Sequence, residues 1–118
     1  MIIGYARVST NDQNLNLQIE ALEKAGCEKI YQEKISGSAK ERSELINLMD
    51  NLREGDVIIV WKLDRLGRSI KNIIDLVLEL NQKKVIIKGL TDGVDTATPN
   101  NEKLRNYFSK NMLSQMFY

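Results

Sequence analysis

The stretch Ile2-Ile3-Gly4-Tyr5-Ala6-Arg7-Val8-Ser9-Thr10 decides the fold. Its first seven residues are mostly apolar and are bounded by polar residues, which is typical of a buried strand. Apolar residues at helical spacing follow directly and predict a helix over residues 11–24, which Gly26 ends. A buried strand that leads at once into an amphipathic helix indicates the first unit of a parallel sheet.

The same alternation continues along the chain. Short β-branched or apolar runs predict further strands over residues 29–33, 57–61 and 84–89, and apolar stripes at helical spacing predict helices over residues 41–52 and 69–80. Residues 35–40 and 91–101 are expected to be loops. Because strands and helices alternate, the sequence predicts an α/β domain with a largely parallel sheet.

Composition narrows the class of protein further. A chain of 118 residues with 42% hydrophobic and 28% charged residues is expected to be one ordinary globular domain. It has no apolar run long enough to span a membrane and no signal-peptide pattern, so we expect a cytoplasmic protein without a membrane partner. The single cysteine, Cys27, agrees with a reducing compartment.

Charge is distributed unevenly along the chain. The net charge is +1, but residues 1–61 carry 7 Lys/Arg against 10 Asp/Glu, whereas residues 62–118 carry 10 against 6. A protein with this balance lacks a broad basic face. Any phosphate-binding site is therefore expected to be local, formed by a few arginines.

Ser9 follows the first predicted strand and precedes the first helix, which is where ligands bind in open parallel sheets. A competing explanation is that Ser9, Thr10 or Asn11 simply caps that helix. Arg7 is expected on the same face of the strand as Ser9, because side chains repeat every two residues. A permanent cation at that place needs an anion beside it.

Three further arginines are expected at the same sheet edge. Arg65 and Arg68 follow the third strand and are neighbours on a first helical turn, where Asp64 has the spacing to pair with Arg68. Arg42 follows the Ser36-Gly37-Ser38 loop and has the reach to fold over this edge. Each one alone is explained as a surface arginine or an ordinary ion pair. Together with a serine they predict a phosphate-binding site.

The available residues restrict the chemistry at such a site. The chain has no histidine, so the usual serine triad is excluded, and it offers no metal-ligand cluster and no glycine-rich nucleotide loop. Phosphoryl transfer depends mainly on positioning and charge stabilisation. Arginine suits this role because its planar fork matches two phosphate oxygens and stays charged when buried. We therefore expect a site without metal or cofactor.

Several motifs together resemble the catalytic domain of serine recombinases, the resolvase/invertase group. They cover residues 1 to about 100 in order and are Tyr5–Thr10, Asp12-Gln13, Gln18, Ser36-Gly37-Ser38 with Arg42, Gly55-Asp56 and Lys62–Arg68. The resemblance implies a single α/β domain with a four- to five-stranded, mostly parallel sheet flanked by helices. It also implies site-specific DNA recombination, in which a serine attacks a phosphodiester and leaves a 5′-phosphoserine link and a free 3′-hydroxyl. The hydroxyl then reverses the attack, and no ATP is needed.

The resemblance assigns roles by position in the sequence. Around the scissile phosphate it places Ser9 as nucleophile, Arg7, Arg65 and Arg68 as phosphate ligands, Arg42 on the phosphate or its neighbour, and Asp64 orienting arginines or assisting proton transfer. As supports of the active-site loop it places Tyr5, Gln13 and Gln18. The implied partners are DNA and further copies of the chain, as a dimer and then a tetramer during strand exchange, if a long dimerisation helix is supplied.

Residues 101–118 depart from the family pattern. We expect a catalytic domain over residues 1–100 and a divergent, helical tail over residues 101–118, without a helix-turn-helix domain. The aromatic residues of this tail are suited to a partner surface. The alternative hypothesis is a truncated catalytic fragment that pairs with full-length recombinases and inhibits them. A third is an unrelated small α/β enzyme or ligand-binding protein that uses the same sheet edge.

Overall fold

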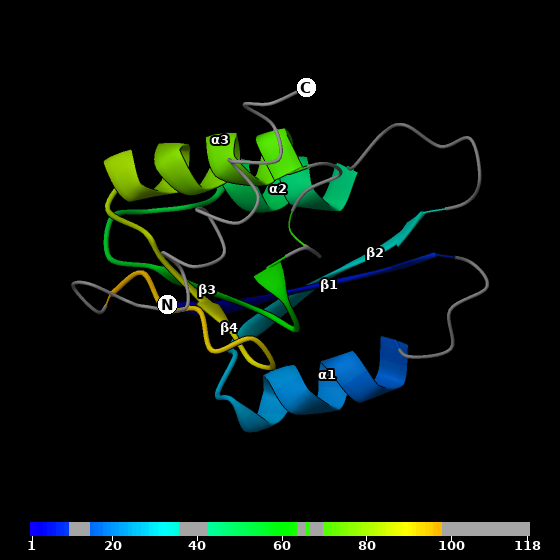
Figure 1. Cartoon of the computed structure of the whole chain (residues 1–118). Helices are drawn as coiled ribbons and strands as arrows, with labels where there is room; N and C mark the ends of the chain where they lie inside the picture. The colour runs from blue at the N-terminus through cyan, green and yellow to red at the C-terminus, as the bar shows by residue number, and fades with distance from the viewer. Residues whose placement is uncertain (10–14, 36–42, 64–65, 67–69, 98–118) are drawn as a thin grey trace.

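The computed structural model describes residues 1–9, 15–35, 43–63, 66 and 70–97, and for residues 8, 9, 15, 35 and 70 it describes the backbone alone. Strands and helices alternate along the chain as the sequence pattern predicts (Figure 1). In chain order the elements are β1 (Ile2–Ser9), α1 (Leu15–Lys24), β2 (Lys29–Ile35), α2 (Ser43–Asp50), β3 (Val57–Val60), α3 (Ile70–Gln82) and β4 (Ile86–Gly89). No helix within these ranges is both long and apolar enough to cross a membrane.

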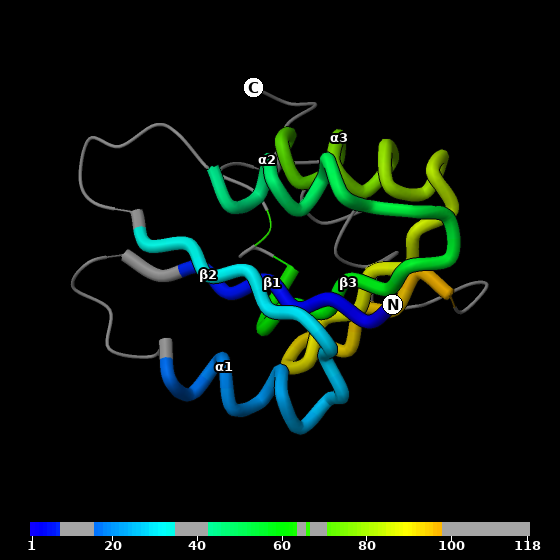
Figure 2. The backbone as a smooth tube through the Cα atoms, turned by 180° about the vertical axis from the view of Figure 1, so that it is seen from behind, coloured from blue at the N-terminus to red at the C-terminus, as the bar shows by residue number. Residues whose placement is uncertain are grey.

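The described strands form one parallel sheet in the order β2-β1-β3-β4. Helix α1 covers one face of this sheet, and α2 and α3 cover the other (Figures 1 and 2). The chain moves outward from β1 to β2 in one direction and from β3 to β4 in the other. The direction of winding therefore reverses between β1 and β3. The predicted α/β class and parallel sheet are confirmed.

Residues of β1 point alternately into two apolar layers, because successive side chains of a strand face opposite ways. Ile3 and Tyr5 belong to the larger layer, which α2 and α3 complete, whereas Ala6 belongs to the smaller layer under α1. Gly4 also faces α1, and a Cβ there would lie 3.0 Å from the Cys27 sulfur. The glycine thus permits close packing of α1 on the sheet.

Several predicted element ends are wrong by one or two residues. The second strand continues past Glu33 to Ile35, because its pairing with β1 extends to the end of that strand. The second helix ends at Asp50 instead of residue 52, and the third strand ends at Val60 instead of Trp61. The carbonyl of Trp61 nevertheless still accepts a backbone hydrogen bond from Thr91 at 3.0 Å.

The fourth strand begins at Ile86 and not at Lys84, because Lys84 ends the preceding helix. Its φ of 61° is in the left-handed region. The Lys84 amide donates to the Asn81 carbonyl at 3.1 Å, and the Val85 amide donates to the Leu80 carbonyl at 2.9 Å. This bonding pattern is that of a Schellman motif, which closes the last turn of a helix. Helix α3 accordingly extends to Gln82 and not only to Leu80.

Asp56 fixes the start of the sheet at the amino ends of the strands. Its Oδ1 accepts a hydrogen bond from the α-amino group of Met1 at 3.1 Å, and its Oδ2 accepts one from the Arg53 amide at 2.9 Å. Burial acts to raise the pKa of this carboxyl, but the two hydrogen bonds and the positive charges of the α-amino group and Arg53 outweigh burial. The pKa of Asp56 therefore lies below its ordinary value, and the folded state favours the carboxylate.

Replacing Asp56 with asparagine is expected to lower the free energy of unfolding at pH 7 by about 1–2 kcal/mol, because an amide cannot accept both bonds. The folded pKa is depressed, so the stabilisation is present above the unfolded pKa and disappears as the pH falls through the folded value. Urea unfolding should show the wild-type advantage shrinking below about pH 4.

The matched control for this prediction is Glu54→Gln. It breaks an exposed ion pair with Lys84, which has an N–O distance of 3.4 Å, and should change stability by less than about 0.5 kcal/mol. A wild-type advantage over Asp56→Asn that stays constant from pH 7 to acid would contradict the charge-based explanation.

Candidate functional site

The candidate site lies where β1 runs past the end of β3. Strand β3 ends at Val60, which is paired with Tyr5, whereas β1 continues to Ser9 and is paired there with β2. This is also the position between β1 and β3 at which the direction of winding reverses. In open parallel sheets, ligands bind at the carboxyl ends of the strands beside such a reversal. The protruding end of β1 is therefore where the topology places a ligand.

Arg7 is the half-buried cation on this protruding end of β1. It shares the alternation of Tyr5, so it is on the face that α2 and α3 cover. Its register partner on β2 is Glu33, which is only 4% exposed. Glu33 Oε2 accepts a hydrogen bond at 2.9 Å from the amide of Glu44, the second residue of α2. A carboxylate is favoured there because a helix N-terminus is partly positive.

Sequence analysis missed Glu33 because an acid in a short strand ordinarily reads as solvent-facing. Its burial depends on two facts that only the fold provides, the register Arg7↔Glu33 and the position of α2 above β2. The signal for Glu33 in the sequence was its negative charge, which is opposite to that of Arg7 at the matching position of the neighbouring strand. Opposite charges on directly paired residues stabilise a sheet.

Gln18 lies on α1, below the face of the sheet opposite to Arg7 (Figure 1). Its side chain is 1% exposed, and neither its amide nitrogen nor its amide oxygen has a hydrogen-bond partner among the described residues. A buried amide without partners is costly and uncommon. Within the described part of the chain, burial thus leaves the Gln18 amide unsatisfied.

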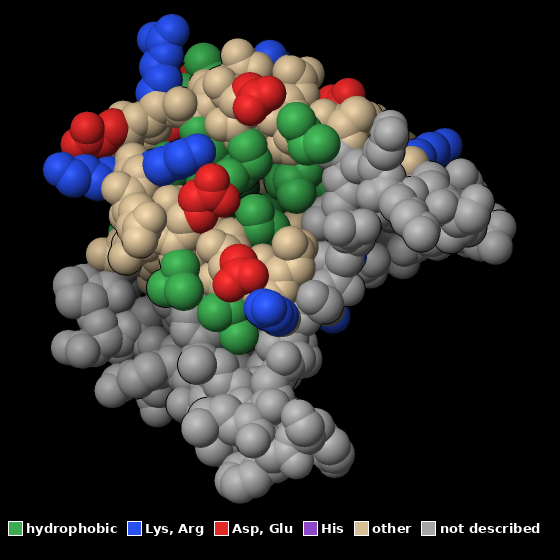
Figure 3. All heavy atoms as spheres, turned by 90° about the horizontal axis from the view of Figure 1, so that it is seen from above, with side chains coloured by type: hydrophobic (Ala, Val, Ile, Leu, Met, Phe, Trp, Pro, Cys, Tyr) green, Lys and Arg blue, Asp and Glu red, His purple; other side chains and the backbone are tan. Residues whose placement is uncertain are grey.

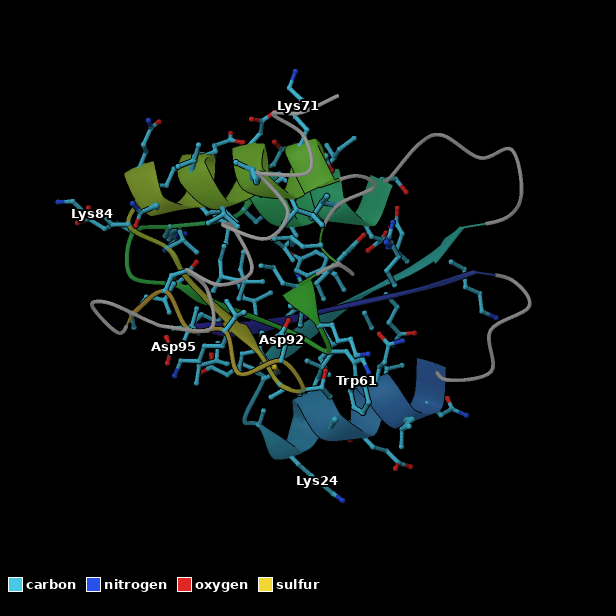
Figure 4. The ribbon with its side chains drawn as sticks, in the orientation of Figure 1. Lys24, Trp61, Lys71, Lys84, Asp92 and Asp95 are labelled. Atoms are coloured by element: carbon cyan, nitrogen blue, oxygen red, sulfur yellow. The ribbon has the colours of Figure 1, made fainter. Side chains whose placement is uncertain are left out.

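Two leucines anchor the segment that follows β3. Leu63 and Leu66 are fully buried, and the Leu66 amide donates to the Leu63 carbonyl at 3.0 Å, which closes a tight turn. The Leu63 amide itself donates to Asp92 Oδ2 at 2.7 Å. Asp92 belongs to the segment that follows β4 and lies close to this turn (Figure 4). Sequence analysis placed Asp92 only in a loop.

The structure brings Tyr5, Arg7 and the backbone of Ser9 together on β1. Tyr5 is fully buried in the larger apolar layer, directly before Arg7 on the same face. Gln18 lies on the other face of the sheet. The remaining predicted site residues lie outside the described residues and are Gln13, Arg42, Asp64, Arg65 and Arg68. Of these, Asp64 and Arg65 fall between the two anchored leucines of the turn.

A half-buried thiol and an open pocket are further features of the described chain. Burial raises the pKa of the Cys27 thiol to about 11, so the thiol is protonated at neutral pH and is a weak nucleophile. Within the described parts of the chain, no three His, Cys, Asp or Glu side chains are grouped to hold a metal ion. An open pocket of about 490 Å³ lies near Lys29, Arg53 and Asp56. It is at the amino ends of the strands, away from the protruding end of β1.

Comparison with known proteins gives a consistent set of matches. Residues 2–113 match the family model described as the resolvase N-terminal domain. The chain is 52% identical over 99 residues to the serine recombinase gin of Escherichia phage Mu, covering 84% of this chain and 51% of that protein. It is also 52% identical over 99 residues to the DNA-invertase of Escherichia phage P1, covering 84% and 53%.

Among solved structures, the fold is similar to a resolvase family site-specific recombinase from Streptococcus pneumoniae. The TM-score is 0.63 at 19% identity, and the match covers 98% of this chain and 92% of the other, so it supports the fold alone. The chain spans about half the length of the curated relatives it matches. The matched family model and the 52% identity agree, and the chain belongs to the resolvase/invertase family of serine recombinases.

Proposed function

We propose that this chain is the catalytic part of a site-specific DNA recombinase, with Ser9 as its nucleophile. The observation that carries the proposal is the protruding end of β1, which presents Arg7 and the backbone of Ser9 at the reversal of the sheet. The names of the relatives, serine recombinase and DNA-invertase, support DNA as the substrate class.

The proposed reaction exchanges one ester for another. The Ser9 oxygen attacks the phosphorus of a DNA phosphodiester, the bond from phosphorus to the 3′ oxygen breaks, and a serine ester with the 5′ phosphate forms. The serine proton leaves, and the departing 3′ oxygen gains a proton and becomes a hydroxyl. A 3′-hydroxyl then attacks the serine ester and releases Ser9. Because each step breaks one phosphate ester bond and makes another, no nucleotide cofactor is consumed.

Arginines are proposed to supply the charge stabilisation. The pentacoordinate phosphorus gains negative charge, and donors that are already in place stabilise it without reorganisation. Arg7 is held on strand β1, and in the sequence Arg65 lies between the buried Leu63 and Leu66 while Arg68 comes after both. Asp64 is proposed to orient the arginines or to assist proton transfer, and Arg42 is proposed to contact the phosphate or its neighbour. Since the chain has no histidine, an imidazole base is unavailable to Ser9.

The test is covalent capture of DNA by the full chain joined to a separate DNA-binding module. The substrate is a duplex in which a library of central sequences is flanked by sites for that module. We expect a protein–DNA adduct that survives detergent, maps to the peptide with Ser9 by mass spectrometry, and leaves a 3′ end that a polymerase extends. An adduct on a different residue, or a blocked 3′ end, would contradict the mechanism.

Gln18 is proposed to support the active-site loop, together with Tyr5 and Gln13. The supporting observation is its buried amide, which has no partner among the described residues. Gln18→Met, which keeps a similar volume, is expected to raise the free energy of unfolding by about 1–2 kcal/mol while lowering adduct formation. Gln32→Met changes an exposed glutamine and is the control. A variant at position 18 that loses stability would contradict the functional explanation.

Association with further copies is also proposed. Apolar side chains gather on the face formed by α2 and α3 (Figure 3), where Ile46 and Leu78 are 59% and 55% exposed. Exposed apolar surface of this kind marks contact sites. The chain is then able either to assemble an active complex or to enter and inhibit complexes of longer relatives. Adding it to a recombining relative separates these outcomes, because only inhibition lowers that relative's turnover.

A further inference from the structure

The segments that follow β3 and β4 are tied together beyond the ends of both strands. The Thr91 amide and the Thr91 hydroxyl both donate to the Trp61 carbonyl, at 3.0 and 2.7 Å. Two residues further along the β3 segment, the Leu63 amide donates to Asp92 Oδ2 at 2.7 Å. The path of the chain after β3 is thus fixed by the segment after β4.

The Asp92 carboxylate is committed to backbone groups on both sides. Oδ2 binds the Leu63 amide, and Oδ1 accepts a hydrogen bond from the Val94 amide at 3.1 Å. Gly89 makes room for it, because a Cβ at position 89 would collide with the carboxylate and lie 2.8 Å from Asp92 Cγ. Asp92 thus bridges two segments of the chain.

The bonded amide has a particular place in the turn. The turn is closed by the hydrogen bond from the Leu66 amide to the Leu63 carbonyl, so the Leu63 amide is at its open, amino-terminal end. Amides at the start of a helical turn have no partner within the turn, and a carboxylate is a favoured acceptor. Asp92 therefore acts as a cap supplied by a distant segment. In the sequence, Asp64 and Arg65 lie between Leu63 and Leu66.

We propose that Asp92 is a positioning residue that holds the turn from Leu63 to Leu66 so that the arginines of residues 62–68 bind phosphate. This inference rests on the proposed function. Asp92 acts through the Leu63 amide and does not contact the phosphate. Since the same carboxylate also binds the Val94 amide, Asp92 ties the segment that follows β4 to the Leu63 amide.

The experiment compares four variants of the full 118-residue chain. Asp92→Ala removes the carboxylate, and Gly89→Ala displaces it while leaving it in the sequence. Asp92→Asn keeps one carbonyl oxygen, enough for the Leu63 amide. Asp95→Ala is the matched control, because Asp95 Oδ1 accepts a local bond from the Ala97 amide at 2.9 Å. Two quantities are measured by NMR, the hydrogen exchange of the Leu63 amide and the affinity for inorganic phosphate from arginine side-chain signals.

Asp92→Ala and Gly89→Ala are expected to accelerate exchange of the Leu63 amide and to weaken phosphate binding, each by about tenfold or more. Asp92→Asn should retain phosphate affinity within about threefold of the wild type, and Asp95→Ala should match the wild type in both quantities. If Asp92→Asn retains phosphate affinity, position 92 needs a hydrogen-bond acceptor for the Leu63 amide and not a negative charge.

Three outcomes would overturn the proposal. These are unchanged exchange at Leu63 in Asp92→Ala, faster exchange with unchanged phosphate affinity, and a wild-type chain whose arginine signals do not respond to phosphate. A different result would refute the proposed function while leaving the role of Asp92 intact. A chain that shows the expected phosphate results but forms no DNA adduct would keep Asp92 as a positioning residue and refute the recombinase chemistry.

Discussion

Replacing Ser9 with alanine is expected to abolish covalent attachment of the chain to DNA while leaving the fold intact. The reaction requires an oxygen nucleophile that becomes the ester oxygen, and alanine has none. Loss of a covalent nucleophile typically lowers the rate by about 10⁴-fold or more. The measurement is the yield of detergent-resistant adduct under the conditions of covalent capture, with thermal unfolding of both proteins to show that the fold persists.

The control for Ser9→Ala is Cys27→Ser, because Cys27 is the single cysteine of the chain and a thiol is the alternative nucleophile to be tested. Its thiol has a pKa raised by burial to about 11 and packs against Gly4 on the α1 face. Cys27→Ser should keep the adduct. If the adduct persists in Ser9→Ala and disappears in Cys27→Ser, the assignment of the nucleophile is wrong.

Much of the architecture is predictable because it depends on local patterns. The apolar run of β1 and the β-branched run of β3 identify buried strands, and their alternation with amphipathic helices implies a parallel sheet. Placement of Arg7 at a carboxyl edge follows from the same reasoning. The register in which Tyr5 meets Val60, and which leaves the end of β1 protruding, is not encoded in either strand alone.

The polar contacts were harder to predict for a related reason. Asp92 reaches the Leu63 amide across 29 positions of sequence, and Glu33 reaches the Glu44 amide only because α2 lies above β2. Such contacts are set by tertiary packing, and a polar residue in a loop or strand carries no local sign of them. Gln18 shows the opposite case. Its helical position is predictable, but its burial without a hydrogen-bond partner among the described residues depends on tertiary packing.

Arg7→Lys is expected to reduce adduct formation by about 10²- to 10³-fold, with little change in stability. Lysine keeps the positive charge beside Glu33, so the paired strands should tolerate it. The ammonium group is a point charge, however, and does not reproduce the fork with which a guanidinium holds two phosphate oxygens. Arginine also stays protonated at a half-buried position, whereas lysine loses its proton more readily there. The measurement is the initial rate of adduct formation at saturating DNA.

Arg53→Lys is the matched control for Arg7→Lys. Arg53 is exposed at the amino ends of the strands, and its backbone amide, which the substitution leaves in place, is the group that binds Asp56. The two variants have the same change in chemistry and the same net charge, and they alter opposite edges of the sheet, at a half-buried position for Arg7 and an exposed one for Arg53. A large loss of rate in Arg7→Lys alone places the phosphate at the carboxyl edge, beside the protruding end of β1. Equal rates in the two variants would mean that Arg7 serves the sheet through Glu33 and not the reaction.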